Sequence, residues 1–345
     1  MEEYYYKQLS KAEGGIYYAI YKGLLNLESE FLIPSCDNQT LYNIFFRLRL
    51  DHPEIFWAKS YKCKYYRESN HYIFIPEYLF SKDKIKTHQA QMTARVKKIT
   101  QGLNAKSMSD FEKEEYVHNF ICENVTYDKL KKAYSHEIIG PLGHGVGVCE
   151  GIAKSVKILL DACGVWNIIT LCDNNPEKGI KYRHVWNIVK IDGHYYHLDV
   201  TFDNTLSAAS SEVRYDYFNL SDKQVFRDHE PIIVPAPKCE TGDHFYYKEK
   251  KLSFTKLEDV YKRSLQAAKK GKTLTFNCRC GYFTKDLIKD ILDQIRKVGD
   301  ERNLKPLVSL NCAQAVVCVR YQEAEYQEEV FIEDANEGEK YDSGE

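Results

Sequence analysis

The chain has 345 residues, more than one ordinary core accommodates, so two or three domains are expected. A net charge of −2 argues against electrostatic nucleic-acid binding as its main role, while 43% hydrophobic residues are enough to build real cores. The 11 cysteines are scattered, without the repeated C-x-x-C pairs of zinc sites, so no metal or other cofactor is predicted.

The N-terminus carries no basic segment followed by an apolar run, so it does not resemble an export signal. No stretch approaches the roughly 18 uninterrupted apolar residues of a membrane span. We therefore expect a cytoplasmic protein with reduced thiols and no membrane partner. The sequence does not predict the oligomeric state.

The first 84 residues predict a small α+β subdomain. Apolar residues recur at helical spacing over residues 10–27 and 39–51, and two strands are expected at 55–66 and 71–76. No reactive constellation occurs here. We expect a subdomain that packs on the rest of the chain or shapes the substrate.

Two further helices are expected before the glycine-rich centre of the chain. A polar helix is predicted over residues 84–102. Ser109 has the character of an N-cap, because acidic residues crowd the turn after it, and the helix that follows should end near Asn124. Residues 129–142 are expected to form a loop.

Cys149 stands in the most distinctive stretch of the sequence. Glycines precede it at positions 143, 145 and 147, and Gly151 follows. Apolar residues at helical spacing then continue to Cys163, which predicts a buried helix that starts at or beside Cys149. A thiol there faces the positive end of the helix dipole, which favours the thiolate, and the glycines would let a substrate backbone approach. For other cysteines we expect buried structural thiols, namely Cys163, Cys172, Cys278 and Cys318.

A β-hairpin is expected downstream of this helix. Two β-rich runs, 184–191 and 194–200, flank the dipeptide Asp192-Gly193, which is typical of a two-residue type I′ turn. A two-residue turn pairs Ile191 with His194. Each step back along the first strand then pairs with one step forward along the second.

This register places a histidine and an aspartate together. Trp186 should lie opposite Asp199 and His184 opposite Thr201, so His184 and Asp199 become diagonal neighbours on one face. Their side chains are then within reach of a hydrogen bond. His197 would lie on the same face, farther from Asp199.

These motifs strongly resemble the transglutaminase-like superfamily. The resemblance is carried by Gly147–Gly151, by His184-Val185-Trp186-Asn187-Ile188-Val189, by Leu198–Asp203 and by Val125–Asp128, and it covers about residues 85 to 205. It implies a papain-like core in which a cysteine at a helix start packs on an antiparallel sheet. Phe202 stands where many members have tryptophan.

The resemblance also implies roles: Cys149 as nucleophile, His184 as general base and acid, and Asp199 as the residue that orients the histidine. A cysteine hydrolase acting on a peptide or protein through a thioester is the first expectation. A transglutaminase and a non-catalytic scaffold are the alternatives. The Cys149 N–H would hold the oxyanion, with His144 or Tyr127 as weaker candidates for a second donor. Asp203 is expected to fix the loop after the second strand.

The last third changes character after the prolines at 231, 235 and 237. Strands are expected at 244–248, 251–254 and 272–278, helices over 256–270 and from Thr284 to Val298, and a final hairpin over 315–332. Cys278-Arg279-Cys280 lacks further ligands and is interpreted as strand thiols. The predicted domains are an N-terminal α+β subdomain (1–84), a transglutaminase-like domain (85–235), a C-terminal α/β domain (236–332) and an acidic tail (333–345).

Overall fold

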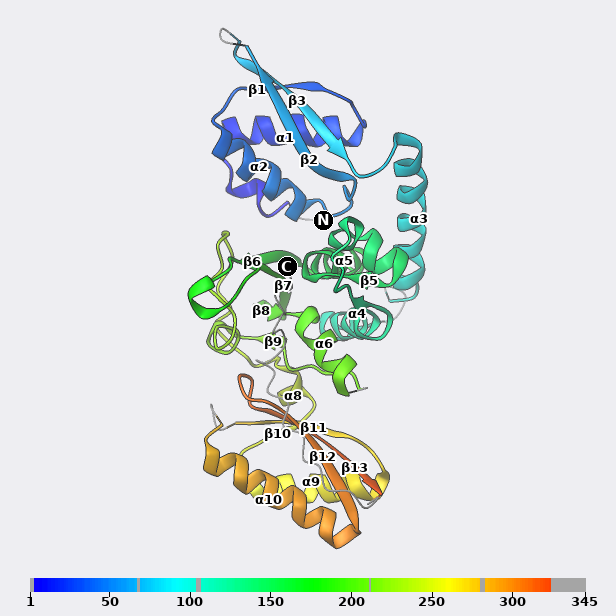
Figure 1. Cartoon of the computed structure of the whole chain (residues 1–345), viewed down its shortest axis with the longest axis vertical. Coiled ribbons are helices and arrows are strands. Elements are labelled where there is room, and N and C mark those ends of the chain that lie inside the picture. Colours follow the sequence, from blue (N-terminus) through cyan, green and yellow to red (C-terminus); the bar gives the residue numbers. More distant parts are fainter. Residues whose placement is uncertain (1–2, 67–68, 104–106, 211, 280–282, 324–345) are drawn as a thin grey trace, which may run out of the picture.

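A computed structural model describes residues 3–66, 69–103, 107–210, 212–279 and 283–323, and it is a mixed α+β structure. Three units follow one another along the long axis of the molecule, in chain order (Figure 1). The predicted acidic tail, the end of the predicted last hairpin and Cys280 lie outside the described residues.

The N-terminal unit combines two helices with a small antiparallel sheet. Both predicted helices and both predicted strands are present, and the sheet gains one edge strand that the sequence did not predict, which pairs with the second predicted strand. Its elements are α1 (Lys11–Leu25), β1 (Phe31–Pro34), α2 (Asn38–Asp51), β2 (Ala58–Tyr65) and β3 (His71–Tyr78), with sheet order β1-β3-β2.

Two helices, α3 (Lys82–Thr100) and α4 (Asp110–Asn124), lead into the central unit. The predicted N-cap is confirmed, because the Ser109 hydroxyl accepts a hydrogen bond from the Glu112 N–H and the Glu112 carboxylate accepts one from the Ser109 N–H. The predicted loop over 129–142 instead contains two short helical segments, Ala133–His136 and Ile139–His144.

The central unit packs one buried helix on a four-stranded antiparallel sheet. Helix α5 (Cys149–Ala162) contacts β7, and the Asn187 amide of that strand donates to the Ala153 carbonyl of the helix (3.0 Å). The sheet has the order β6-β7-β8-β9, from β6 (Asn167–Cys172), β7 (His184–Ile191), β8 (His194–Leu198) and β9 (Phe218–Leu220). A short parallel pair, β4 (Thr126–Tyr127) and β5 (Val146–Gly147), precedes α5.

The predicted hairpin is confirmed in its turn and register but not in its length. Asp192 and Gly193 both have positive φ (48° and 87°), as a type I′ turn requires, and Ile191 pairs with His194. However, β8 ends at Leu198, and helix α6 (Val200–Ser210) begins two residues later. The expected pairing of Trp186 with Asp199 and of His184 with Thr201 is therefore wrong.

The described part of the C-terminal unit packs two long helices on a four-stranded sheet, with the short helix α8 (Tyr246–Glu249) before them. The expected strand over 244–248 is wrong, because α8 occupies it, and the last hairpin begins earlier than predicted. The N-cap at Thr284 is confirmed. The elements are β10 (Ser253–Phe254), α9 (Leu257–Lys270), β11 (Leu274–Cys278), α10 (Lys285–Arg302), β12 (Leu304–Asn311) and β13 (Val316–Glu323), with sheet order β10-β11-β13-β12.

One large hydrophobic cluster spans the N-terminal and central units, with α1, α2, α4 and α5 all contributing. The helices and sheet of the C-terminal unit bury a separate cluster. The predicted domain boundaries at 84 and 235 remain predictions. Among the described residues, none of the helices is both long and apolar enough to cross a bilayer.

Candidate active site

Cys149 is the first residue of α5, as predicted. The chain enters the helix from β5 through Val148, whose backbone is extended and whose side chain supplies no cap. The N–H groups of a first helical turn have no partner within the helix, so they are available to an anion beside the thiol. The side chain of Cys149 is only partly buried and faces a cavity.

The glycines around Cys149 serve packing within the chain. A Cβ at Gly151 would lie 2.2 Å from the Ser135 carbonyl oxygen, and one at Gly147 would lie 2.6 Å from the Pro141 ring. Backbone of this chain, rather than of a substrate, makes the close approach at Gly151. Gly147 and Gly151 thus let the first turn of α5 pack against residues 133–141, while the approach of a substrate backbone to these glycines stays a prediction.

The structure brings His184 and Asp199 together. His184 begins β7, Asp199 directly follows β8, and His184 Nε2 lies 2.5 Å from Asp199 Oδ2. The stacked ring of Trp186 (5.7 Å between centroids) and the tilted ring of Phe202 (4.7 Å) flank the imidazole. The predicted hydrogen bond is present, although Asp199 lies directly after the end of β8 and not within the strand.

The second carboxylate oxygen of Asp199 caps the N-terminus of helix α6. Oδ1 accepts hydrogen bonds from the backbone N–H groups of Thr201 (2.9 Å) and Phe202 (3.1 Å), in the first turn of α6. This N-capping arrangement fixes the rotation of the carboxylate. It also explains why the strand stops at Leu198, since the chain turns into a helix that Asp199 caps.

Cys149 of α5 and His184 of β7 lie next to each other. Burial by itself lowers the pKa of His184, but the Asp199 carboxylate and the neighbouring Cys149 sulfur outweigh it, so that the pKa lies well above its usual value. Because Nε2 bonds Asp199, the ring nitrogen left for Cys149 is Nδ1. Burial also raises the pKa of Asp199, while His184 and His229 reverse this effect and hold it well below its usual value.

His229 is a site residue that the sequence analysis missed. Its Nε2 lies 2.9 Å from the same Asp199 Oδ2 that bonds His184, and its Nδ1 lies 2.8 Å from Asp228 Oδ1. It follows helix α7 (Asp222–Val225) in a segment without a regular sequence pattern. No local signal links it to Asp199, so only the tertiary structure could identify it.

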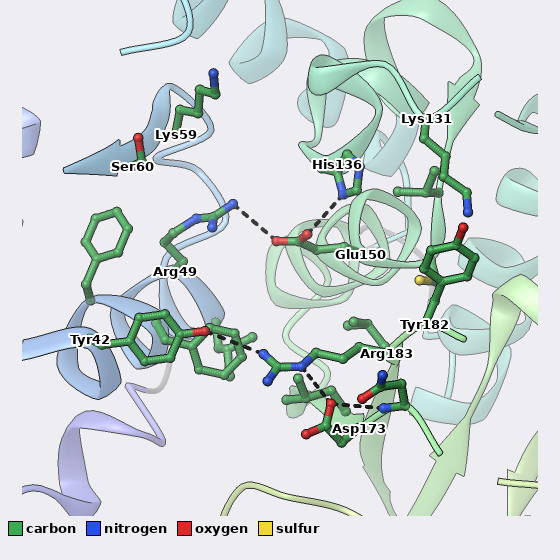
Figure 2. A pocket seen from close by; sticks show the side chains of 18 of the residues that line it. Tyr42, Arg49, Lys59, Ser60, Lys131, His136, Glu150, Asp173, Tyr182 and Arg183 are labelled. Carbon is green, nitrogen blue, oxygen red and sulfur yellow. Dashed lines mark hydrogen bonds and ion pairs between the residues drawn. The ribbon is translucent and has the colours of Figure 1, made fainter. Parts of the chain in front are cut away.

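A cavity of about 960 Å³ opens onto Cys149. The N-terminal unit forms one wall through α2 and β2, and the central unit forms the other, with the 173–183 segment along one side (Figure 2). Its lining is rich in aromatic side chains, namely Tyr42, Phe45, Phe46, Tyr61, Tyr127 and Tyr182.

Charged side chains join the two walls of this cavity beside Cys149. Arg49 of α2 pairs with Glu137. It also pairs with Glu150, where Nη2 and Oε1 lie 3.2 Å apart (Figure 2). Glu150 Oε1 also accepts from the buried Lys154 ammonium (2.7 Å). Burial raises the pKa of Glu150, but Lys154, His136 and Arg49 together bring it far below its usual value. The residue next to Cys149 is thus a fixed anion.

The two candidates for a second oxyanion donor lie in different places. Tyr127 lines the cavity that contains Cys149. His144 lines a separate cavity of about 520 Å³ and packs against the Tyr134 ring, 4.8 Å away. The geometry therefore does not support His144 as a donor at Cys149.

Asp203 and His197 support the structure at a distance from Cys149. Asp203 lies within α6 rather than in a loop, where Oδ2 contacts His118 Nε2 (3.0 Å) and Oδ1 accepts the Tyr217 N–H (3.0 Å). His197 Nδ1 accepts from Trp186 Nε1 (3.0 Å), so its Nε2 donates to the Asp222 carboxylate (2.8 Å).

The four cysteines predicted to be structural are buried, and burial raises the pKa of Cys163 to about 11. Two groups of described residues place possible metal ligands together: His184, Asp199 and His229, and His197, Asp222 and Cys239. Hydrogen bonds account for both. Two ligands about 2.0–2.1 Å from a tetrahedral zinc lie roughly 3.3 Å apart, whereas His184 and Asp199 are 2.5 Å apart.

Part of the chain matches a known protein family. Residues 97–200 match the family model of the transglutaminase-like superfamily, which covers α4, α5 and the hairpin with Cys149, His184 and Asp199. No curated protein matches the sequence.

Three solved structures resemble part of the chain. A protein described as a TGase has 13% identity and a TM-score of 0.28, covering 42% of this chain and 44% of its own. A candidate cysteine protease from Cytophaga hutchinsonii has 12% identity and a TM-score of 0.27 (42% and 62% covered). A candidate protease from Parabacteroides distasonis has 14% identity and a TM-score of 0.24 (42% and 40% covered).

These likenesses are too distant to carry an argument about activity, and the chain spans less than two thirds of each of those proteins. The matched range contains Cys149, His184 and Asp199, which the structure brings together. Residues 97–200 of this chain are a core of the transglutaminase-like superfamily.

Proposed function

We propose that the protein is a cysteine hydrolase that cleaves an amide bond of a peptide or protein through a thioester on Cys149. The observation that carries the proposal is the position of Cys149: it begins α5, contacts His184 and faces the cavity of about 960 Å³. That volume falls within the roughly 300–1,000 Å³ of typical ligand pockets. A peptide segment with apolar side chains suits its aromatic lining.

In the proposed reaction, His184 and Cys149 share one proton. The Cys149 thiolate attacks the amide carbonyl carbon, and the negative charge that moves to oxygen is stabilised by the backbone N–H of Cys149 at the start of α5. The His184 imidazolium gives its proton to the leaving amine as the C–N bond breaks. The neutral His184 then accepts a proton from water, whose oxygen attacks the thioester and releases the acid and the thiol.

Asp199 acts on this reaction through His184. Its Oδ2 bonds Nε2 and thereby turns Nδ1 towards Cys149, while its ionised form stabilises the imidazolium. The N–H groups of α6 that bond Oδ1 keep the carboxylate from rotating.

Alkylation with iodoacetamide tests the nucleophile directly. At about pH 6 we expect Cys149 to be labelled roughly tenfold or more faster than Cys312, an exposed cysteine of the same chain. His184→Ala should remove this advantage. If mass spectrometry finds Cys149 no more reactive than Cys312, the proposal is wrong.

A peptide library with and without a labelled amine then separates the two reactions of the thioester. Hydrolysis gives a new carboxylate whether or not the amine is present, and Cys149→Ala abolishes it. Incorporation of the amine into the peptide, at the expense of hydrolysis, would instead identify a transglutaminase.

A further inference from the structure

His229 lies where two carboxylates meet. Its side chain is 1% exposed, and each ring nitrogen faces an acid, with Asp199 at 2.9 Å and Asp228 at 2.8 Å. An imidazole with a carboxylate at each nitrogen donates both hydrogen bonds only as the imidazolium. Burial lowers the pKa of His229, but the two acids outweigh it and the pKa is raised.

The positive charge of His229 lies close to His184. The two rings are 5.3 Å apart, and both bond the same oxygen of Asp199. A cation at this position competes with His184 for the negative charge of Asp199 and repels a second proton. His229 therefore reduces the tendency of His184 to stay protonated while keeping Asp199 ionised.

The other groups around His229 hold it in place. Asp228 Oδ2 accepts the Tyr217 hydroxyl (2.5 Å), and the rings of Trp186, Phe202 and Tyr217 enclose the imidazole at 4.7–5.6 Å. His197 lies near His229: burial lowers its pKa, and its Nε2 bonds the Asp222 carboxylate.

One of the residues that hold Asp228, and through it His229, belongs to the C-terminal unit. Gln314, between β12 and β13, places its amide nitrogen 3.4 Å from both oxygens of Asp228 and donates to the Gln224 carbonyl (3.2 Å). The C-terminal unit thus contributes to the environment of the His184–Asp199 pair, although it does not line the cavity at Cys149.

We propose that His229, held by Asp228, is a positioning residue that fixes the Asp199 carboxylate and sets how readily His184 releases its proton. This inference rests on the proposed function for its catalytic meaning. A proton on His184 is needed to expel the amine, and its release is needed to activate water. A second cation beside Asp199 would balance these two demands.

The test uses His229→Gln and Asp228→Asn in the full chain. Gln keeps an N–H donor for Asp199 without the charge, and Asn at 228 removes the acid that holds His229 protonated, without touching Asp199. For both variants we expect His184 to titrate about one pH unit higher than in the wild type, measured by NMR of the labelled imidazole. In the pH profile of the Cys149 alkylation rate, the high-pH limb should move to higher pH by the same amount.

The titration does not depend on hydrolysis, so the two proposals can fail separately. If His184 shifts but no peptide is cleaved, His229 has the inferred role and the proposed function is wrong. If both variants fold, as judged by circular dichroism, and His184 titrates as in the wild type, the inference is overturned. His229→Ala, which also removes the donor, should lower kcat more than His229→Gln and leave KM nearly unchanged.

Discussion

At the scale of single residues, Asp199 organises the candidate site. Oδ2 bonds two histidines, and Oδ1 bonds two backbone N–H groups of α6, so all four partners depend on one buried carboxylate. A carboxylate with this many donors stays ionised when buried. Its charge in turn favours the protonated form of His184.

The raised pKa of His184 predicts a pH-dependent contribution to stability. A group whose pKa is higher in the folded state stabilises that state fully below its unfolded pKa of about 6.5, and the contribution is lost as pH rises through the folded pKa. We expect His184→Gln to lower the free energy of unfolding by about 1.5–3 kcal/mol near pH 6. The difference should shrink at higher pH, as followed by urea unfolding.

His194→Gln is the matched control, because His194 is an exposed histidine of the same hairpin. Its free energy of unfolding should follow the wild type across this pH range. A gap between wild type and His184→Gln that widened with rising pH would contradict the assigned direction of the pKa.

At the scale of elements, α6 connects the site to the body of the central unit. It starts directly after Asp199, and its Asp203 contacts His118 of α4 at 3.0 Å, with both side chains fully buried. Burial and the nearby Asp216 raise the pKa of Asp203 well above its usual value. Asp203 thus joins α4, α6 and the segment before β9 by hydrogen bonds inside the core.

Replacing Asp203 tests what these buried hydrogen bonds contribute to stability. Asp203→Ala leaves the Tyr217 N–H and His118 without their partner, at a cost of roughly 1–3 kcal/mol for each buried group. Urea unfolding should show the loss, and Asp203→Asn, which keeps an oxygen and a nitrogen there, should restore part of it. Thr205→Ala, at an exposed position of the same helix, serves as control. If Asp203→Ala unfolds at the same urea concentration as the wild type, Asp203 does not stabilise the core in this way.

At the scale of the molecule, the N-terminal unit forms one wall of the cavity at Cys149. Tyr42 of α2 lies on this wall, stacked parallel to Phe46 with 6.2 Å between centroids, and its hydroxyl accepts from Arg183 (3.5 Å). The N-terminal and central units also share a hydrophobic cluster. Substrate contacts on this wall would act on binding and not on the bonds that change.

Tyr42→Ala should therefore raise KM by about three- to tenfold with kcat nearly unchanged, since an aromatic contact is lost without disturbing Cys149 or His184. Steady-state kinetics on a cleaved peptide measures both. Tyr65→Ala on β2 is the control, because Tyr65 is 73% exposed and does not line the cavity. An equal KM for Tyr42→Ala and wild type would mean that the substrate does not use this wall.

Local patterns in the sequence were sufficient for much of the fold and for part of the site. Helical spacing after Cys149 predicted where α5 begins, and Asp192-Gly193 predicted the turn and register of β7 and β8. Both depend on interactions within a few residues. The same local logic extended β8 too far, because the end of the strand is decided by the cap that Asp199 provides for α6.

The sequence by itself determined that a cysteine would begin a helix and that His184 and Asp199 would lie together. Only the tertiary structure decided that Cys149 meets His184, that His229 shares Asp199, and that α2 forms a wall of the cavity. The physical reason is that these contacts join residues 30 to about 100 positions apart, through packing between elements. No periodicity or turn chemistry along the chain specifies such contacts.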